Sequence, residues 1–159
     1  MRIILFFTVI IALLQQAGCS KDSGQPADMP KLYPVAIEAT GDGKPREEII
    51  VTLTAKTPAK YGAASATTDA NGVAKIRTYG HAGVPQGEYT VTFSKIAVEG
   101  ARIVMNAGAE DEVGGQLYQY VDDKYVKESS TLYSITVGEK GAKETFEIGS
   151  PVHTFMRNN

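Results

Sequence analysis

The chain has 159 residues, of which 43% are apolar and 21% are charged, and its formal net charge is -2. This balance is typical of a globular protein with room for one domain, and it excludes a disordered acidic chain. Lys and Arg are scattered and form no basic run, so the sequence predicts no binding to nucleic acid. Val, Ile, Thr and Tyr are abundant and helical periodicity is nearly absent, which favours an all-β fold.

The N-terminus has the pattern of an export signal. Arg2 precedes an apolar run from residue 3 to residue 14 that only Thr8 interrupts. A run of about a dozen residues fits a signal peptide and is short for a membrane span, which needs about 20 residues. Residues 1–18 are therefore predicted to be a signal peptide.

The predicted signal ends at Cys19, the only cysteine of the chain. The sequence of residues 15–19, Gln-Gln-Ala-Gly-Cys, resembles the bacterial lipobox, in which cleavage occurs directly before a cysteine that becomes diacylated; Gln16 stands where Leu is usual. Exported proteins normally use cysteines in pairs, so a single cysteine here favours lipid attachment at Cys19 over a plain secretory signal. Because Ser20 follows the cysteine instead of an Asp, the resemblance implies an outer-membrane lipoprotein that faces the periplasm or the cell surface.

The segment after Cys19 is polar. Residues 21–30 hold almost nothing to bury, so residues 19–31 are predicted to form a flexible linker between the lipid and the domain. The folded domain is then expected over residues 32–150, and residues 151–159 are expected to form a C-terminal tail.

Seven short segments with alternating or continuous apolar residues predict strands, and turn residues separate them. They are residues 33–39, 49–54, 64–68, 73–79, 89–94, 133–137 and 144–148. Asn71 and Gly72 supply the positive φ angles of a tight hairpin turn. No βαβ spacing is present, so the pattern predicts a seven-stranded antiparallel β-sandwich with Greek-key connections rather than a parallel sheet.

Residues 97–131 lack clear periodicity and are expected to form a long loop, which in a compact domain is usually functional or mobile. The segment contains the acidic run at residues 110–112 and three tyrosines: Tyr118, Tyr120 and Tyr125.

Two motifs in the middle of the chain resemble the carboxypeptidase regulatory-like, or transthyretin-like, domain. Residues 67–74 carry a Thr-Asp-x-Asn-Gly turn, and residues 85–89 carry Pro-x-Gly-x-Tyr before the next strand. The resemblance covers residues 32–149 and implies a prealbumin-like sandwich, found in many accessory, adhesion and envelope modules without enzymatic activity. Tyr89 itself is expected to bury its ring and to bond its hydroxyl group to the backbone.

The sequence offers little for metal binding or catalysis. The two histidines, His81 and His153, have no cysteine partner, and zinc needs three or four convergent ligands. The acidic run lacks the alternating pattern of calcium loops, and no nucleophile elbow is present. Transthyretin-like enzymes that hydrolyse 5-hydroxyisourate use several histidines and a Tyr-Arg-Gly-Ser tail, which this chain lacks. We therefore expect a non-enzymatic protein without metal or cofactor.

Binding is the function that remains. Tyr118, Tyr120 and Tyr125 supply rigid, amphipathic contact area and form the candidate surface for an envelope protein or a polysaccharide. Alternatively, these rings pack over the open edge of the sandwich as the core of the loop. A different alternative is a hydrolase or metal-dependent enzyme that uses the acidic loop at residues 108–122 with His81 or His153, and a third is a passive spacer.

Overall fold

The computed structural model describes residues 24–100, 102–106, 109–113 and 115–156. The predicted signal peptide and the predicted lipid attachment at Cys19 therefore lie outside the described residues. The described chain is all-β, with a single four-residue helix, α1 (Asp123–Val126). No helix among these residues has the length and apolar character that crossing a membrane requires. The all-β prediction is confirmed.

The larger sheet has six strands in the order β15-β10-β4-β5-β7-β8. Its pairs are all antiparallel, and β10 lies between β4 and β15. The strands are β4 (Ile50–Ala55), β5 (Ala63–Thr67), β7 (Arg77–Thr78), β8 (His81–Ala82), β10 (Gly87–Ser94) and β15 (Ser134–Val137). A short pair outside this sheet joins β1 (Leu32–Tyr33) to β9 (Val84–Pro85).

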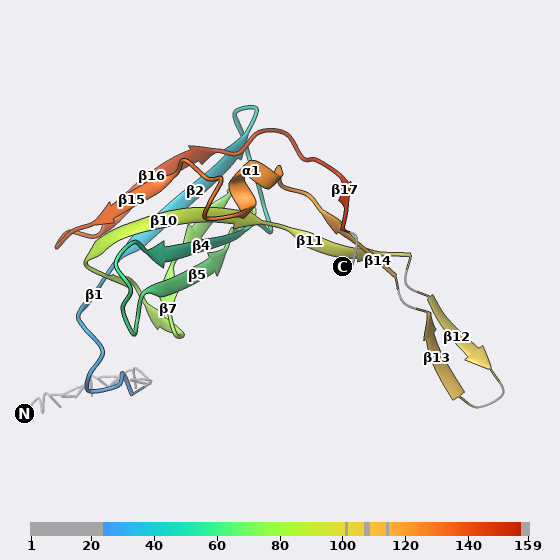
Figure 1. Ribbon diagram of the computed structural model, residues 1–159, viewed down its shortest axis with the longest axis horizontal. Coiled ribbons are helices and arrows are strands. Elements are labelled where there is room, and N and C mark those ends of the chain that lie inside the picture. Colours follow the sequence, from blue (N-terminus) through green and yellow to red (C-terminus); the bar gives the residue numbers. More distant parts are fainter. Residues whose placement is uncertain (1–23, 101, 107–108, 114, 157–159) are drawn as a thin grey trace, which may run out of the picture.

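The smaller sheet lies across the core from the larger one (Figure 1). It consists of β2 (Val35–Gly41), β3 (Lys44–Pro45), β6 (Val73–Lys75) and β16 (Ala142–Glu147), with β2 between β16 and β6. The pair of β16 and β2 is parallel, so the prediction of purely antiparallel pairing is wrong here. After β15 the chain turns at residues 138–141 and passes to the other sheet, so β16 does not fold back on β15 as a hairpin partner.

The turn at Asp69–Gly72 forms with the predicted positive φ at Gly72, but Asn71 does not adopt the positive φ that was predicted for it, and the flanking strands separate between the sheets. The Asp69 carboxylate accepts hydrogen bonds from the backbone amides of Asn71 and Val73 at 2.9 and 3.0 Å. Beyond the turn, β6 pairs with β2 in the smaller sheet, whereas β7 pairs with β5 in the larger one. The chain thus changes sheets within the segment that the sequence predicted to be one strand.

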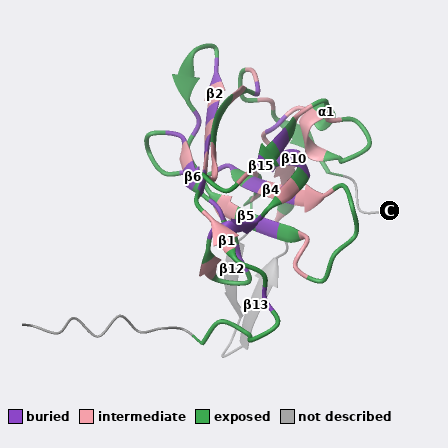
Figure 2. Ribbon diagram, turned by 90° about the vertical axis from the view of Figure 1, so that its left-hand side faces the viewer, coloured by how far each residue is buried: buried purple, intermediate pink, exposed green. Residues whose placement is uncertain are grey.

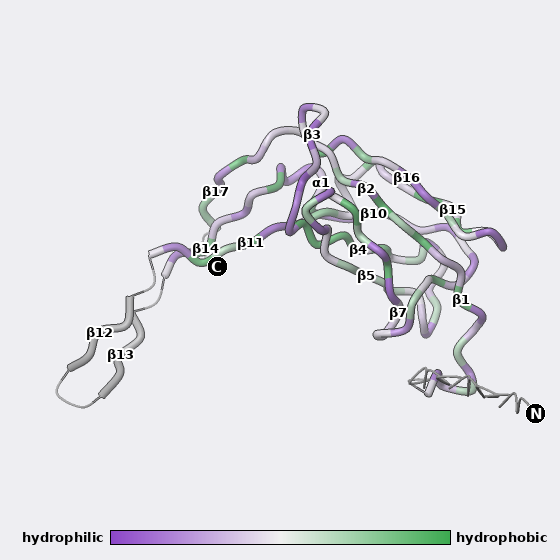
Figure 3. Tube along the Cα trace, turned by 180° about the vertical axis from the view of Figure 1, so that it is seen from behind, coloured by the Kyte–Doolittle hydropathy of each residue, from purple (hydrophilic) through white to green (hydrophobic). Residues whose placement is uncertain are grey.

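The two sheets share one apolar core, because alternate residues of their strands point inward. Along β2 every second residue is buried, and β4 and β10 face it with their own buried side chains (Figures 2 and 3). The largest fully buried side chains include Phe93, Ile37, Leu53 and Tyr89. The Tyr89 hydroxyl donates to the carbonyl of Pro85 at 2.9 Å, which confirms the predicted role of this residue, and burial raises its pKa.

The prediction of a loop at residues 97–131 is wrong for most of this segment, because the chain forms an extended ribbon of short paired strands. We call residues 96–119 together with β17 the arm. It contains β11 (Ile96–Glu99), β12 (Arg102–Asn106), β13 (Ala109–Val113), β14 (Gln116–Gln119) and β17 (Thr154–Phe155). β11 pairs with β14, β12 with β13, and β17 with the other edge of β14. Figure 1 shows that the arm projects away from the two sheets.

The second half of the predicted linker contacts the sandwich. Met29 is only 7% exposed, and the Asp28 carboxylate pairs with the Lys60 ammonium group and accepts a hydrogen bond from the Tyr61 hydroxyl at 2.8 Å. These contacts place the described start of the chain beside the connection between β4 and β5. The first described residues therefore lie at the end of the molecule opposite the arm (Figure 1).

Two glycines with the same backbone conformation test the turn chemistry. Gly43 and Gly72 have φ angles of 72° and 73°, but a Cβ at Gly72 would lie 2.6 Å from the carbonyl oxygen of Ala39, whereas a Cβ at Gly43 would meet nothing within 4 Å. We expect Gly43→Ala to lower the free energy of unfolding by about 1 kcal/mol and Gly72→Ala by about 2 kcal/mol or more. Urea unfolding measures both, and equal losses would contradict the proposed backbone clash.

Candidate functional site

The arm is fixed to the sandwich by the buried side chain of Gln119, which is 3% exposed. Its Oε1 atom accepts hydrogen bonds from the backbone amides of Lys95, Tyr120 and Val121 at 3.0, 3.0 and 3.2 Å. Lys95 lies where the chain leaves β10 for the arm, and the other two residues lie where it returns. The Tyr120 amide is shared with the carbonyl of Lys95 at 2.8 Å, whereas Gln119 is the acceptor for the amides of Lys95 and Val121. A buried backbone donor without a partner costs about 1–3 kcal/mol, so this one side chain stabilises both ends of the junction.

Arg46 joins the same junction to the C-terminal segment. Its guanidinium group donates to the carbonyl of Gly149 and, at 3.2 Å, to the carbonyl of Tyr120. Burial lowers the pKa of Arg46, and the nearby carboxylates of Glu147 and Asp42 oppose that effect. Arg46 therefore holds the chain after β16 close to the end of β14, from where it continues to β17.

Glu147 turns the chain at the end of β16. Its carboxylate accepts hydrogen bonds from the Thr40 hydroxyl at 2.9 Å and from the backbone amides of Asp42 and Gly149 at 2.7 and 3.1 Å. The hydrogen bond from Thr40, followed by those from the backbone amides, holds the pKa of Glu147 below its usual value of 4.5. The carboxylate thereby joins the loop after β2 to the start of the C-terminal segment.

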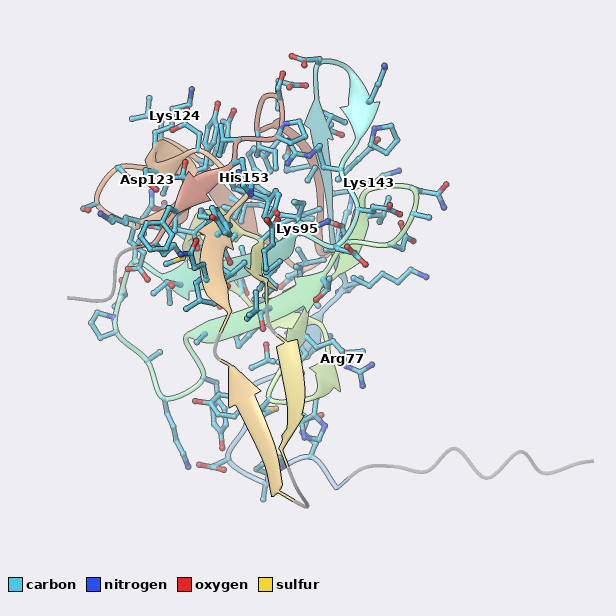
Figure 4. All side chains as sticks on the ribbon, turned by 90° about the vertical axis from the view of Figure 1, so that its right-hand side faces the viewer. Arg77, Lys95, Asp123, Lys124, Lys143 and His153 are labelled. Carbon is cyan, nitrogen blue, oxygen red and sulfur yellow. The ribbon has the colours of Figure 1, made fainter. Side chains whose placement is uncertain are left out.

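One surface of the arm is built from aromatic side chains of β14, β17 and the residues beside them. Tyr118 stacks on His153 with ring centroids 4.1 Å apart and planes within 7°, and Phe155 lies 5.8 Å from Tyr118. Tyr120 contacts the same histidine at 5.4 Å. Figure 4 shows His153, together with Lys95, where the arm meets the sandwich. We call Tyr118, Tyr120, His153 and Phe155 the aromatic face.

Glu99 joins the rings of the aromatic face through hydrogen bonds. The Tyr120 hydroxyl donates to its Oε1 atom, and His153 Nε2 lies 3.2 Å from both carboxylate oxygens. The His153 and Glu99 side chains are 53% and 45% exposed, so the network lies in contact with solvent. An open hollow of about 410 Å³ adjoins Tyr118 and is lined by Glu99, Gly100, Gly115 and Gln116. The aromatic face is thus ordered by internal contacts and still accessible.

The opposite surface of the arm is apolar. Val98 is paired with Leu117 in the β11–β14 ladder, and Ile96 lies two residues before Val98, so all three side chains point to one surface. Met156 donates its backbone amide to the carbonyl of Leu117, which continues this surface beyond β17. Ile96 and Val98 are 49% and 57% exposed. The strands β11 and β14 therefore expose apolar side chains on the surface opposite the aromatic face.

The structure brings two of the three tyrosines of the predicted binding surface together. Tyr118 and Tyr120 both contact His153, whereas Tyr125 lies on α1 and stacks on Tyr133 with ring centroids 5.5 Å apart. Tyr125 also packs against the edge of the core, as the alternative interpretation of these rings expects. His153 and Phe155 also belong to this surface, although neither residue was predicted to; their alternation in the tail is the signal that could have indicated a strand.

The residues of the predicted enzymatic alternative are not brought together where the structure describes them. His81 lies in β8 at the edge of the larger sheet, whereas His153 lies beside β14 in the arm. The acidic run belongs to β13, and its side chains are outside the described residues. Among the described residues, no group of three or more His, Cys, Asp or Glu side chains is placed to hold a metal ion.

Comparison with known proteins gives no relative for this chain: no family model, no curated protein and no solved structure matches it. The resemblance to transthyretin-like domains therefore remains a prediction.

The lowered pKa of Glu147 predicts a pH-dependent contribution to stability. A carboxylate with a lower pKa in the folded state stabilises the fold above its unfolded pKa, near 4.5, and this stabilisation is lost as the pH falls through the folded value. We expect Glu147→Gln to lower the urea midpoint at pH 7, and the difference from wild type to shrink toward pH 3. Glu144→Gln on the same strand is the control: both carboxylates are exposed, but among the described residues only Glu147 of the two accepts hydrogen bonds, from Thr40 and from the amides of Asp42 and Gly149. A difference for Glu147→Gln that is constant with pH would contradict this role.

Proposed function

We propose that this protein is a lipid-anchored, non-catalytic envelope module with a transthyretin-like β-sandwich, and that it binds an envelope protein or a polymer through the aromatic face of its arm. One observation carries the proposal: the arm projects from the sandwich and exposes an ordered aromatic cluster, Tyr118, Tyr120, His153 and Phe155. A partner would bury this area with little loss of side-chain freedom.

The physical chemistry of the aromatic face suits recognition of a protein. Tyrosine offers a large rigid ring with a polar end, and such residues are enriched at the centre of interfaces. Stacking with His153 and the hydrogen bonds to Glu99 already restrict the rings, so the ordering cost of binding is low. The exposed apolar surface with Ile96 and Val98 lies behind the same strands and enlarges the area available to a partner.

The transthyretin-like assignment rests on the turn motifs, whose residues have structural contacts. Asp69 and Gly72 form the turn between the sheets, and Tyr89 bonds to Pro85 within the second motif. These side chains maintain the fold, whereas the exposed rings of the arm are available to a partner. Binding residues are often found on exposed segments that a rigid scaffold holds in place, and the arm on this sandwich has that arrangement.

The arm and the aromatic face can be tested together with a matched pair of variants. We expect Tyr118→Ala/Phe155→Ala to lose the partners that wild type retains in a pull-down from detergent-solubilised envelope, because the variant removes two contacting rings. Tyr61→Ala/Tyr79→Ala is the control, since these residues also form a surface aromatic pair, with centroids 5.7 Å apart, but lie outside the arm. Identical partners for all three proteins would contradict the aromatic face as the binding site.

The predicted anchor has a separate test. Cys19→Ser removes the thiol that would be acylated, and two acyl chains are what makes membrane attachment stable. We expect wild type to sediment with the membranes and the variant to be released into the soluble fraction. A wild-type protein that is already soluble would contradict lipid attachment.

A further inference from the structure

A groove on the outer surface of the smaller sheet contains three lysines from three different elements. Lys75 belongs to β6, Lys143 belongs to β16, and Lys140 lies in the turn before β16. The groove has a volume of about 690 Å³. We call it the lysine groove.

Strand register explains why two of these lysines face the same space. Ala36 in β2 is paired with Lys75 on one side and with Lys143 on the other, so the three side chains project from one surface of the sheet. Neighbouring strands lie about 4.8 Å apart, so the Cα atoms of the two lysines are separated by about 10 Å. The small side chain of Ala36 leaves the space between them open.

The walls of the groove are fixed by close backbone contacts. A Cβ at Gly141 would lie 1.9 Å from the carbonyl oxygen of Pro34, and a Cβ at Gly83 would lie 2.7 Å from the carbonyl oxygen of Tyr33. Two turns thus approach the segment Leu32–Pro34 from both sides, closer than any other residue type would allow. Close backbone contacts therefore fix this side of the groove, and the lysine side chains line the rest.

The charge and polarity of the groove identify the class of ligand. Within the described chain, its only charged lining residues are the three lysines; no Asp or Glu lines it, and the other lining residues are Leu, Ile, Val, Ala, Pro and Gly. The nearest acid along β2 is Glu38, whose carboxylate accepts a hydrogen bond from Thr145 at 3.2 Å. None of the three lysines has an ion-pair partner among the described residues. Positive charge over an apolar floor suits an anionic amphiphile rather than a sugar, which would require polar and aromatic contacts.

We infer that the lysine groove docks onto the anionic phospholipid surface of the membrane in which the chain is anchored. The inference rests on the proposed lipid anchor, because Leu32 and Pro34, which line the groove, directly follow the segment that leads from Cys19. Because the chain already contacts the sandwich at Asp28, the stretch from Cys19 to this residue would reach about 15–20 Å as a random coil, so the proposed anchor would keep the groove near the membrane. The groove lies at the end of the molecule opposite the arm, so docking would direct the arm away from the membrane (Figure 1).

The test measures how fast a water-soluble amine reagent labels Lys140 in the full chain, read by mass spectrometry. The chain is reconstituted in vesicles of phosphatidylcholine alone or with added phosphatidylglycerol. We expect Lys140 to be labelled several times more slowly in the anionic vesicles, while labelling of the exposed Lys44 and Lys127 is unchanged. Equal labelling of Lys140 in both vesicle types would overturn the inference.

A matched pair of variants isolates the groove. Lys75→Gln/Lys143→Gln should weaken docking by about thirtyfold, because each lysine near an anionic surface contributes about fivefold, and Lys140 should then be labelled equally in both vesicle types. Lys44→Gln/Lys127→Gln removes the same charge elsewhere and should leave the protection intact. Loss of protection in both variants would overturn the inference, since it would show a general effect of net charge.

Two further measurements separate the other outcomes. Inorganic phosphate added to phosphatidylcholine vesicles should not protect Lys140; protection there would overturn a lipid surface and indicate a soluble anion as the ligand. Gel filtration of the vesicles reports the anchor independently. If the chain elutes separately from phosphatidylcholine vesicles but anionic vesicles still protect Lys140, the result would support the groove and contradict the anchor. If the chain elutes with both kinds of vesicle but Lys140 is not protected, the result would support the anchor and overturn the groove.

Discussion

Burial of alternate side chains from β2, β4 and β10 in one apolar core is the interaction on which the rest of the structure depends. The chain has a single cysteine, so no disulfide within the chain can hold the two sheets together. Core packing and strand pairing must therefore supply the stability. Tyr133 extends the core at one edge: its ring packs on Phe93 and Phe146, and its hydroxyl donates to the carbonyl of Glu147. This contact links the residue just before β15 of one sheet to the end of β16 in the other.

A small polar junction attaches the arm to the part of the molecule that contains the core. Gln119 satisfies the backbone where the chain enters and leaves the arm, and Arg46 ties the C-terminal segment to the end of β14. Because buried polar groups are costly without partners, these contacts define where the sandwich ends and where the arm begins. They also bring β17 beside β14, which completes the aromatic face with His153 and Phe155. A polar junction therefore determines the geometry of an aromatic surface.

The two proposals agree on how the molecule would be oriented relative to the membrane. The described N-terminal segment and the lysine groove lie at one end, and the arm projects at the other (Figure 1). A lipid at Cys19 and an anionic membrane surface against the groove would act as two attachments at the same end. Combined attachments of this kind are more stable than a single one and also restrict orientation. The aromatic face would then be presented at a distance from the membrane, where an envelope protein or polymer could reach it.

The sequence by itself determined the local features of this protein. Period-two alternation in residues 33–39 and 89–94, and the chemistry of Gly72 and Tyr89, depend on neighbouring residues only, and these predictions are confirmed. Only the tertiary structure decided which strands pair, because pairing joins residues far apart in the chain: β16 runs parallel to β2, and β6 and β7 belong to different sheets. The arm was missed because its short strands are interrupted by glycines and acidic residues that mask the alternation. His153 joins Tyr118, and Lys75 joins Lys143, through cross-strand register, which local sequence does not encode.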